Sequence, residues 1–234
     1  MSVPEHIVLV ENKLKVLAHL YFAQRKHVQA LQLMSKKLRS SLGEKGLEEV
    51  FELIVESMKA NDDYRKFVLD YAEHVAVNHP VYVDYLSRLN GAGKYSAFML
   101  GLIPARKFET ISKLWKYTGH APPEIYSGQK KYNVKAKTLV HQVVENMMRN
   151  KSYYYQLYKS FREEEDREHP DLPAKHRHMR ALRKVKKLFL SHYWTMYRKI
   201  LGLPIRLPYS VERGIEQTFI KPFVEKPKLE FINI

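Results

Sequence analysis

The chain has 234 residues, a formal net charge of +15 at pH 7 and no cysteine. The length suits one or two domains with a sizeable core, and the lack of cysteine excludes disulfides, cysteine-based zinc sites and thiol catalysis. So high a positive charge favours a polyanionic partner, DNA or RNA, with a membrane surface as the rival. No apolar run approaches the roughly 18 residues that span a bilayer, and the N-terminus lacks a signal-peptide pattern, so we expect a soluble, cytoplasmic protein with no membrane partner.

Helical periodicity dominates the N-terminal region, residues 1–78. From about residue 4 to residue 40, apolar residues recur at helical spacing, which predicts one long helix or two helices separated by a break. Further helices are expected at 47–58 and at 62–79, the latter capped by Asn61 or Asp62. Because a long amphipathic helix often buries its apolar stripe on a partner, these helices could pair two chains into a homodimer. Four side chains of the helix at 47–58 are expected to point inward: Val50, Phe51, Ile54 and Val55.

The segment 85–100 reads as a short amphipathic helix, a turn with two glycines and the start of a second helix. The glycines allow the positive φ angles of a sharp turn. Unpaired N–H groups and the helix dipole at the start of the second helix favour a phosphate, and a lysine adds a full charge. The pattern predicts a helix-hairpin-helix element that holds nucleic-acid backbone without reading sequence; the alternative is an ordinary turn with a glycine C-cap. The residues expected at the phosphate are Asn90, Gly91, Ala92, Gly93 and Lys94.

The remainder of the region 79–203 is also expected to be helical. Helices are predicted at about 108–117, 134–150, 152–168 and 175–201. Ser152 is expected to cap the third of these. Four prolines exclude a continuous helix in the region 204–234: Pro204, Pro208, Pro222 and Pro227. The predicted fold class is therefore all-α, a helical bundle containing a helix-hairpin-helix element, followed by an extended, Pro-rich C-terminal tail that could wrap the domain.

The helix at 175–201 separates its residues sharply, with apolar side chains on one side and cations on the other. A one-sided basic stripe is the electrostatic footprint of nucleic-acid binding, although charge runs more often form a solvated face. We favour contact with the nucleic-acid backbone because few acidic residues dilute the stripe. The candidate residues are Arg177, Arg180, Arg183, Lys184 and Lys187.

A second basic cluster lies in and after the loop 119–134, beside Tyr126 and Tyr132. Cations interleaved with aromatic rings can hold phosphates and stack bases. A surface loop with one tyrosine tucked into the core is an equally good interpretation. The candidate residues are Lys130, Lys131, Lys135 and, nearby, Lys137.

The residues also bear on metal chemistry. The only dense acidic run is 163–166, and four consecutive helical residues point around the helix instead of converging on an ion, so a solvated acidic face is expected. The eleven histidines form no compact ligand set. We therefore expect no metal site and no cofactor.

From about Phe67 to Leu203 the chain resembles the C-terminal helical domain of the Piv/MooV-type insertion-sequence transposases. That domain has a Pro-Gly-Ile-Gly hairpin, an alanine after it, a Phe and a Leu on the next helix, a Tyr-x-Gly-x-x-Pro motif and a Ser-Gly loop. The matching residues here are, in chain order, Leu89-Asn90-Gly91-Ala92-Gly93, Ala97, Phe108, Leu114, Tyr117-Thr118-Gly119-His120-Ala121-Pro122 and Ser127-Gly128. The match covers a little over half of the chain, and basic helices follow in both.

The resemblance implies a role for Ser127, because the serine of the Ser-Gly loop is the strand-transfer nucleophile in that family. A serine hydroxyl needs a base or a metal to activate it, and in the family the metal-binding carboxylates of a RuvC-like nuclease domain lie opposite it. The residues before Phe67 read as helices, without the strand-borne aspartate that begins such a domain. The resemblance therefore implies nucleic-acid binding more than autonomous catalysis.

We predict a protein that binds nucleic-acid backbone without sequence specificity, DNA ahead of RNA, in a mobile genetic element or virus. Two alternatives stay open. One is a strand-transferase subunit that uses Ser127 together with a partner nuclease. The other is a structural or assembly protein, such as a virion component or a dimeric scaffold.

Overall fold

The computed structural model describes residues 3–42, 47–122, 132–206 and 220–226. Within these ranges every regular element is helical, which confirms the predicted all-α class. The α-helices are α1 (Glu5–Leu42), α2 (Glu48–Ala76), α3 (Pro80–Asp84), α4 (Tyr95–Leu102), α5 (Ile111–Tyr117), α6 (Val134–Arg149), α7 (Tyr153–Glu168) and α8 (Ala174–Ile200). Short 3-10 turns, η1 (Leu86–Arg88) and η2 (Ala105–Lys107), flank α4.

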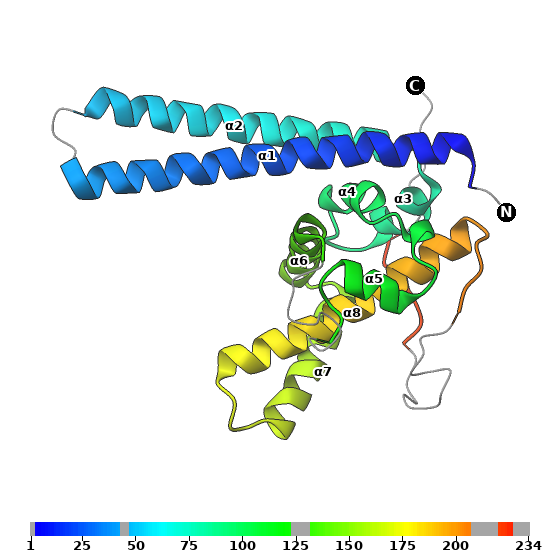
Figure 1. The fold of residues 1–234 in the computed structure, drawn as a ribbon. Coiled ribbons are helices and arrows are strands. Elements are labelled where there is room, and N and C mark those ends of the chain that lie inside the picture. The colour runs from blue at the N-terminus through cyan, green and yellow to red at the C-terminus, as the bar shows by residue number, and fades with distance from the viewer. Residues whose placement is uncertain (1–2, 43–46, 123–131, 207–219, 227–234) are drawn as a thin grey trace.

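α1 and α2 form a long hairpin whose far end projects beyond the rest of the molecule (Figure 1). α2 runs without interruption, so the predicted helix start at Asn61 or Asp62 is wrong. The side chain of Asn61 donates a hydrogen bond of 2.7 Å to the carbonyl of Ser57, four residues earlier in the same helix. A polar side chain that bonds back to the preceding turn can lie inside a helix. The residue type of Asn61 therefore did not mark a helix start.

Only part of the apolar surface of α2 faces α1. Phe51 and Ile54 are buried as predicted, whereas Val50 and Val55 are exposed. Each step along a helix turns the side chain by about 100°, so neighbouring residues cannot share the buried face. Val50 and Val55 are therefore exposed on different sides of α2.

The first half of α1 lies on α4, whose residues from Ser96 to Leu102 are all buried. The backbones come so close that a Cβ on Gly101 would lie 2.3 Å from the backbone nitrogen of Lys15. Leu14 and Tyr21 of α1 share one hydrophobic core with Phe98 of α4. This core spans the predicted boundary at residue 78, so the N-terminal hairpin and the following helices fold against each other.

A buried carboxylate fastens α1 to the body. Glu11 is 2% exposed and accepts hydrogen bonds from the guanidinium of Arg106, at 2.8 Å, and from the hydroxyl of Tyr197. Burial alone would raise the pKa of Glu11, but hydrogen bonding to His79, Arg106 and Tyr197 outweighs it and lowers the pKa. The carboxylate is thus held charged between α1 and the body.

α7 and α8 form a second, shorter hairpin that projects from the body on the side away from α1 (Figure 1). The other end of α8 is anchored in the core through Tyr193, Trp194 and Tyr197. Two helical hairpins therefore extend from one packed body that contains α4, α6 and the buried half of α8.

Residues 220–226 are extended and lie beside the start of α7. The backbone amides of Glu225 and Lys226 donate hydrogen bonds of 3.0 and 2.9 Å to the carbonyl of Arg88. The ring of Phe223 meets the ring of Tyr153 edge-on, with centroids 4.5 Å apart. The other tail residues, 207–219 and 227–234, lie outside the described part of the chain, so the course of the full tail stays a prediction.

Candidate nucleic-acid interface

The glycine turn has the backbone geometry that its sequence predicts. Gly91 and Gly93 have φ angles of 75° and 60°. A Cβ on Gly91 would lie 2.7 Å from both the carbonyl oxygen of Asn146 and the Cβ of Asn150, so the turn is pressed against the end of α6. Ala92 is fully buried. The first helix of the predicted helix-hairpin-helix is here only the short α3 followed by η1, so binding of phosphate by the turn stays a prediction.

The chain itself supplies an anion to this turn. The carboxylate of Glu225 accepts one hydrogen bond of 2.8 Å from the backbone amide of Asn90 and another of 2.7 Å from that of Tyr153, the first residue of α7. Ser152 occupies the N-cap position but makes no capping bond, and its hydroxyl is buried without a hydrogen-bond partner among the described residues. An internal carboxylate therefore binds the amide of Asn90, one of the residues predicted to contact a phosphate.

The charge on Lys94 is also matched within the chain. Its ammonium pairs with Asp70 and lies 3.7 Å from Glu73, both on α2. The hydrogen bond to Asp70, followed by the charges of both carboxylates, raises the pKa of Lys94. The lysine of the turn thus ties the body to the hairpin.

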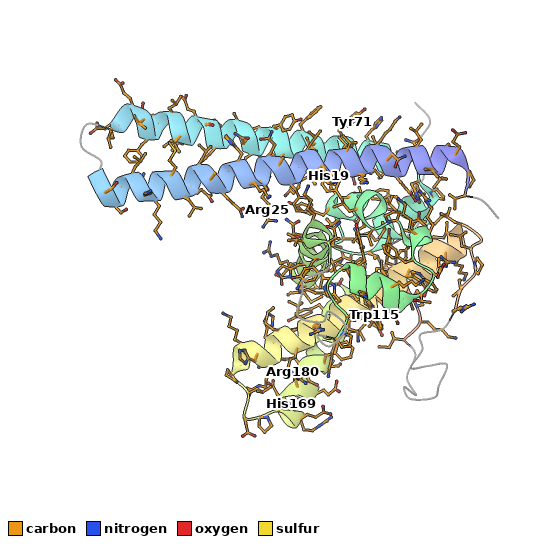
Figure 2. All side chains as sticks on the ribbon, in the orientation of Figure 1. His19, Arg25, Tyr71, Trp115, His169 and Arg180 are labelled. Atoms are coloured by element: carbon orange, nitrogen blue, oxygen red, sulfur yellow. The ribbon has the colours of Figure 1, made fainter. Side chains whose placement is uncertain are left out.

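The basic stripe of α8 faces acidic residues of α7. Arg177 pairs with Asp166 at 2.6 Å, and Arg180 pairs with Glu165. Lys184 lies 2.9 Å from Glu165 and 3.0 Å from a second carboxylate of the run. Figure 2 labels Arg180 and His169 on this hairpin, and their side chains are 2.8 Å apart. Much of the predicted stripe is therefore engaged in holding α7 against α8.

The expectation that the acidic run 163–166 forms a solvated face is wrong for Glu165. Its side chain is only 1% exposed. Burial alone would raise the pKa of Glu165, but Lys184 and Arg180 outweigh it and lower the pKa. The sequence could not show this, because the cations lie on a different helix.

Two further residues of the stripe lie at the junction with α5. Arg183 donates hydrogen bonds to the carbonyl oxygens of His120 and Ala121. The ammonium of Lys187 lies 4.2 Å above the ring of Trp115, a residue labelled in Figure 2. These contacts join α8 to the segment that follows α5.

The loop cluster is only partly described. Ser127, Lys130 and Lys131 lie outside the described residues, so their predicted roles stay predictions. Lys135, in the first turn of α6, has its ammonium 2.6 Å from Nδ1 of His19 on α1. Lys137 lies 4.6 Å above the ring of Tyr132. The described part of the cluster therefore faces α1 and its own loop.

Cations of α1, α6 and α8 lie along α6: Lys135 of α6 contacts His19 of α1, and the charges of Arg25 of α1 and Lys186 of α8 act on His141 of α6. We call this the α1–α6–α8 basic surface, and its members are Lys15, His19, Arg25, Lys135, His141 and Lys186. Among the described residues, none of its lysines or its arginine forms an ion pair with a carboxylate, whereas His141 lies 3.9 Å from Glu145 of the same helix. One terminal nitrogen of Arg25 is buried without a hydrogen-bond partner in the described chain. Figure 2 shows Arg25 on the side of α1 that faces the body.

The pKa shifts of this surface have two causes, burial and the charges of neighbouring groups. Burial and the charges of Lys135 and Lys15 lower the pKa of His19. Burial, followed by the charge of Lys186, lowers the pKa of His141, while the charge of Glu145 opposes this shift. Burial also lowers the pKa of Lys186 to about 8; the charge of Glu145 opposes this shift and that of Lys137 adds to it. Nearby cations oppose protonation, so a bound anion would relieve this repulsion.

Sequence reasoning found only Lys135 of this surface. Lys15, Arg25 and Lys186 are far apart in the chain, and none belongs to a one-sided basic stripe. A concentration of charge assembled by tertiary packing leaves no local pattern to detect.

The described residues contain no group of three or more His, Asp or Glu side chains that could hold a metal ion. Among their helices, none combines the length and the apolar character that a membrane crossing needs. Comparisons of the chain with protein-family models, curated proteins and solved structures found no match in any of the three. The resemblance to the transposase domain therefore stays a prediction.

Proposed function

We propose that this chain binds the phosphate backbone of nucleic acid, with DNA as its first target, and does so without reading base sequence. The observation that supports this best is the α1–α6–α8 basic surface. There, Lys15, Arg25 and Lys135 of α1 and α6 have no carboxylate ion-pair partner among the described residues, and the protein has a net charge of +15. Such a surface attracts polyanions and binds phosphates through charge and hydrogen bonding.

We place the phosphates on this surface because the other candidate groups that the structure describes have partners within the chain. The amide of Asn90 bonds to Glu225, and Lys94 pairs with α2. Arg180 and Lys184 pair with Glu165. To contact a phosphate, these groups would first have to leave a carboxylate, whereas Lys15 and Lys135 would lose no such partner.

The salt dependence of binding gives a quantitative expectation. Lys186 is buried, so three cations of the surface, Lys15, Arg25 and Lys135, are available to phosphates. If each neutralises one phosphate, log K should fall with log salt with a slope of about −2.7, a loss of affinity of about 40-fold between 50 and 200 mM salt.

The test compares two double variants with equal change in net charge. Lys15→Glu/Lys135→Glu reverses two charges of the surface, and Lys107→Glu/Lys199→Glu reverses two exposed lysines at η2 and at the end of α8. Binding to duplex DNA of two unrelated sequences, to single-stranded DNA and to RNA is measured by fluorescence anisotropy at several salt concentrations. Circular dichroism confirms that both variants remain helical.

We expect the first variant to lose at least tenfold in affinity with a flatter salt slope, and the second to lose less than threefold. Similar affinity for the two duplex sequences is expected as well. Equal losses in both variants would mean that overall charge, and not this surface, drives binding. Absence of binding to every nucleic acid at 50 mM salt would overturn the function, and a clear preference for RNA would replace DNA as the target.

A further inference from the structure

α2 carries a second apolar row that the rest of the described chain leaves exposed. Leu53, Phe67 and Tyr71 are 67%, 63% and 49% exposed. The row advances in alternate steps of three and four residues, which is the spacing of a coiled-coil seam. Its apolar members are Val50, Leu53, Ala60, Tyr64, Phe67 and Tyr71, and the polar Ser57 and His74 continue the same spacing. The rings of Phe67 and Tyr71 stack along the helix with centroids 6.2 Å apart, so the row is a continuous surface.

This row lies on the side of α2 away from the body. Glu73 bonds to Tyr82 and lies near Lys94, both of the body. Since a helix turns about 100° per residue, Glu73 and Tyr71 point about 160° apart. Figure 2 shows Tyr71 on the outer side of the hairpin.

α1 carries a matching row on the same side. Val16 and Leu20 are 60% and 40% exposed. Val16 points about 160° away from Leu14, whose backbone lies against Gly101 of α4. The members of this row are Leu9, Val16, Leu20, Ala23, His27, Ala30 and Met34. The two rows together form what we call the outer hairpin face.

We propose that a second copy of this chain covers the outer hairpin face, so that two α1–α2 hairpins pack into a four-helix bundle. A two-fold axis parallel to the hairpins sets α2 of each copy antiparallel against α1 of the other. This inference does not depend on nucleic-acid binding, because the basic surface lies on the side of α1 that faces the body.

The opposite net charges of α1 and α2 favour this arrangement over one in which α2 packs against α2. α1 contains seven Lys or Arg and two Glu, a formal charge of +5, whereas α2 contains three Lys or Arg and eight Asp or Glu, a formal charge of −5. Along one flank of the α2 row, acidic residues recur every seven positions: Glu49, Glu56, Asp63 and Asp70. Packing α2 against α2 would bring these acids together, while packing α2 against α1 pairs opposite charges.

The heights of the two rows agree with this packing. Within one hairpin, Arg65 lies 5.0 Å from the centroid of the Tyr21 ring and Arg39 lies 5.0 Å from that of Phe51. A residue of α1 and a residue of α2 that lie at the same level along the hairpin axis therefore have residue numbers whose sum is between 86 and 90.

Rotation about a two-fold axis parallel to the helices does not move a residue along the axis. Residues of the two copies therefore meet at these same levels. Val16 and Leu20 of the second copy then meet Tyr71 and Phe67, so aliphatic side chains meet aromatic rings. Farther along the hairpin, away from the body, Met34 of the second copy meets Leu53. On the outer flank, Lys26 of one copy reaches the height of Asp62 and Asp63 of the other.

The face has the size that a dimer needs. From Leu53 to His74 the row is about 32 Å long at 1.5 Å per residue, and two helices side by side are about 20 Å wide. Such a face buries on the order of 600 Å² per copy, or about 1,200 Å² in total, which reaches the lower end of stable protein interfaces.

Sedimentation equilibrium of the full chain between 1 and 100 µM tests the proposal. The wild type is expected to be a dimer of twice the 27.7 kDa chain mass. Leu53→Glu should weaken dimerisation at least tenfold. The control Val55→Glu changes a residue of the same helix that is 60% exposed but points away from the face, and it should weaken dimerisation less than threefold. A monomeric wild type, or equal effects of both variants, would overturn the proposal.

Disulfide crosslinking tests the arrangement of the helices, since the chain has no native cysteine. Two single variants are mixed and oxidised, so that only a bond between chains joins them. Leu53→Cys with Met34→Cys should crosslink efficiently, whereas Leu53→Cys with Tyr71→Cys should not. The reverse result would show α2 packed against α2 and would refute the proposed axis.

Discussion

The carboxylate of Glu225 caps the backbone amide of Tyr153 at 2.7 Å, although the two residues lie 72 positions apart in the chain. The same carboxylate accepts the amide of Asn90. One side chain from the C-terminal region thereby satisfies the first turn of α7 and the glycine turn before α4.

Glu225→Ala should lower the free energy of unfolding by about 1–2 kcal/mol, because it removes a charged helix cap together with a second hydrogen bond. Hydrogen exchange should show lost protection at the amides of Asn90 and Tyr153. Glu163→Ala is a suitable control, since Glu163 is exposed on α7. Unchanged protection at both amides would mean that the cap does not persist in solution.

Gly91→Ala and Gly93→Ala should differ in cost although both residues have positive φ. The strain of a left-handed conformation costs about 1–2 kcal/mol at either position. At Gly91 the new Cβ would also meet Asn146 and Asn150 at 2.7 Å, whereas at Gly93 its nearest neighbours are 3.9 Å away. Chemical denaturation should therefore rank Gly91→Ala as the more damaging, and equal losses would argue against the packing of this turn on α6.

Glu165→Ala should destabilise the α7–α8 hairpin, because it leaves Arg180 and Lys184 without their shared carboxylate. Both cations are partly exposed, so a loss of about 1–2 kcal/mol is expected instead of the full cost of a broken buried pair. A double-mutant cycle with Arg180→Ala measures the coupling directly. A coupling near zero would show that the pair contributes nothing to stability.

The protein should lose stability as the pH falls from about 6.5 toward 4, and His192 should contribute. Burial lowers the pKa of His192 to about 4, and its ring bonds to Tyr154 and to the carbonyl of Ile220. In this pH window the unfolded chain binds a proton at His192 that the folded chain does not, so protonation favours unfolding.

The contribution of His192 is on the order of 1 kcal/mol per pH unit across that window. His192→Gln should flatten the pH dependence of the unfolding free energy between these limits. His6→Gln changes an exposed histidine and should leave the slope as it is in the wild type. An unchanged slope in His192→Gln would assign the acid sensitivity to other groups.

The sequence by itself determined the all-α class and most helix positions, because those follow from the spacing of apolar residues and from proline and glycine, which act locally. It also determined the positive φ angles of Gly91 and Gly93. It erred within α2, where Asn61 has the residue type of a cap but bonds to Ser57 inside a continuous helix. Side-chain propensity is a weak preference that the packing of a long hairpin overrides.

Only the tertiary structure decided which charges have partners. The stripe on α8 is plain in the sequence, yet Glu165 and its neighbours on α7 neutralise much of it, and Glu225 binds the amide of Asn90 at the glycine turn. The α1–α6–α8 basic surface is the opposite case, since Lys135 reaches His19 of α1, and Lys186 of α8 acts on His141, only when these helices pack. Electrostatic attraction depends on distance in space, and a local sequence pattern contains only distance along the chain.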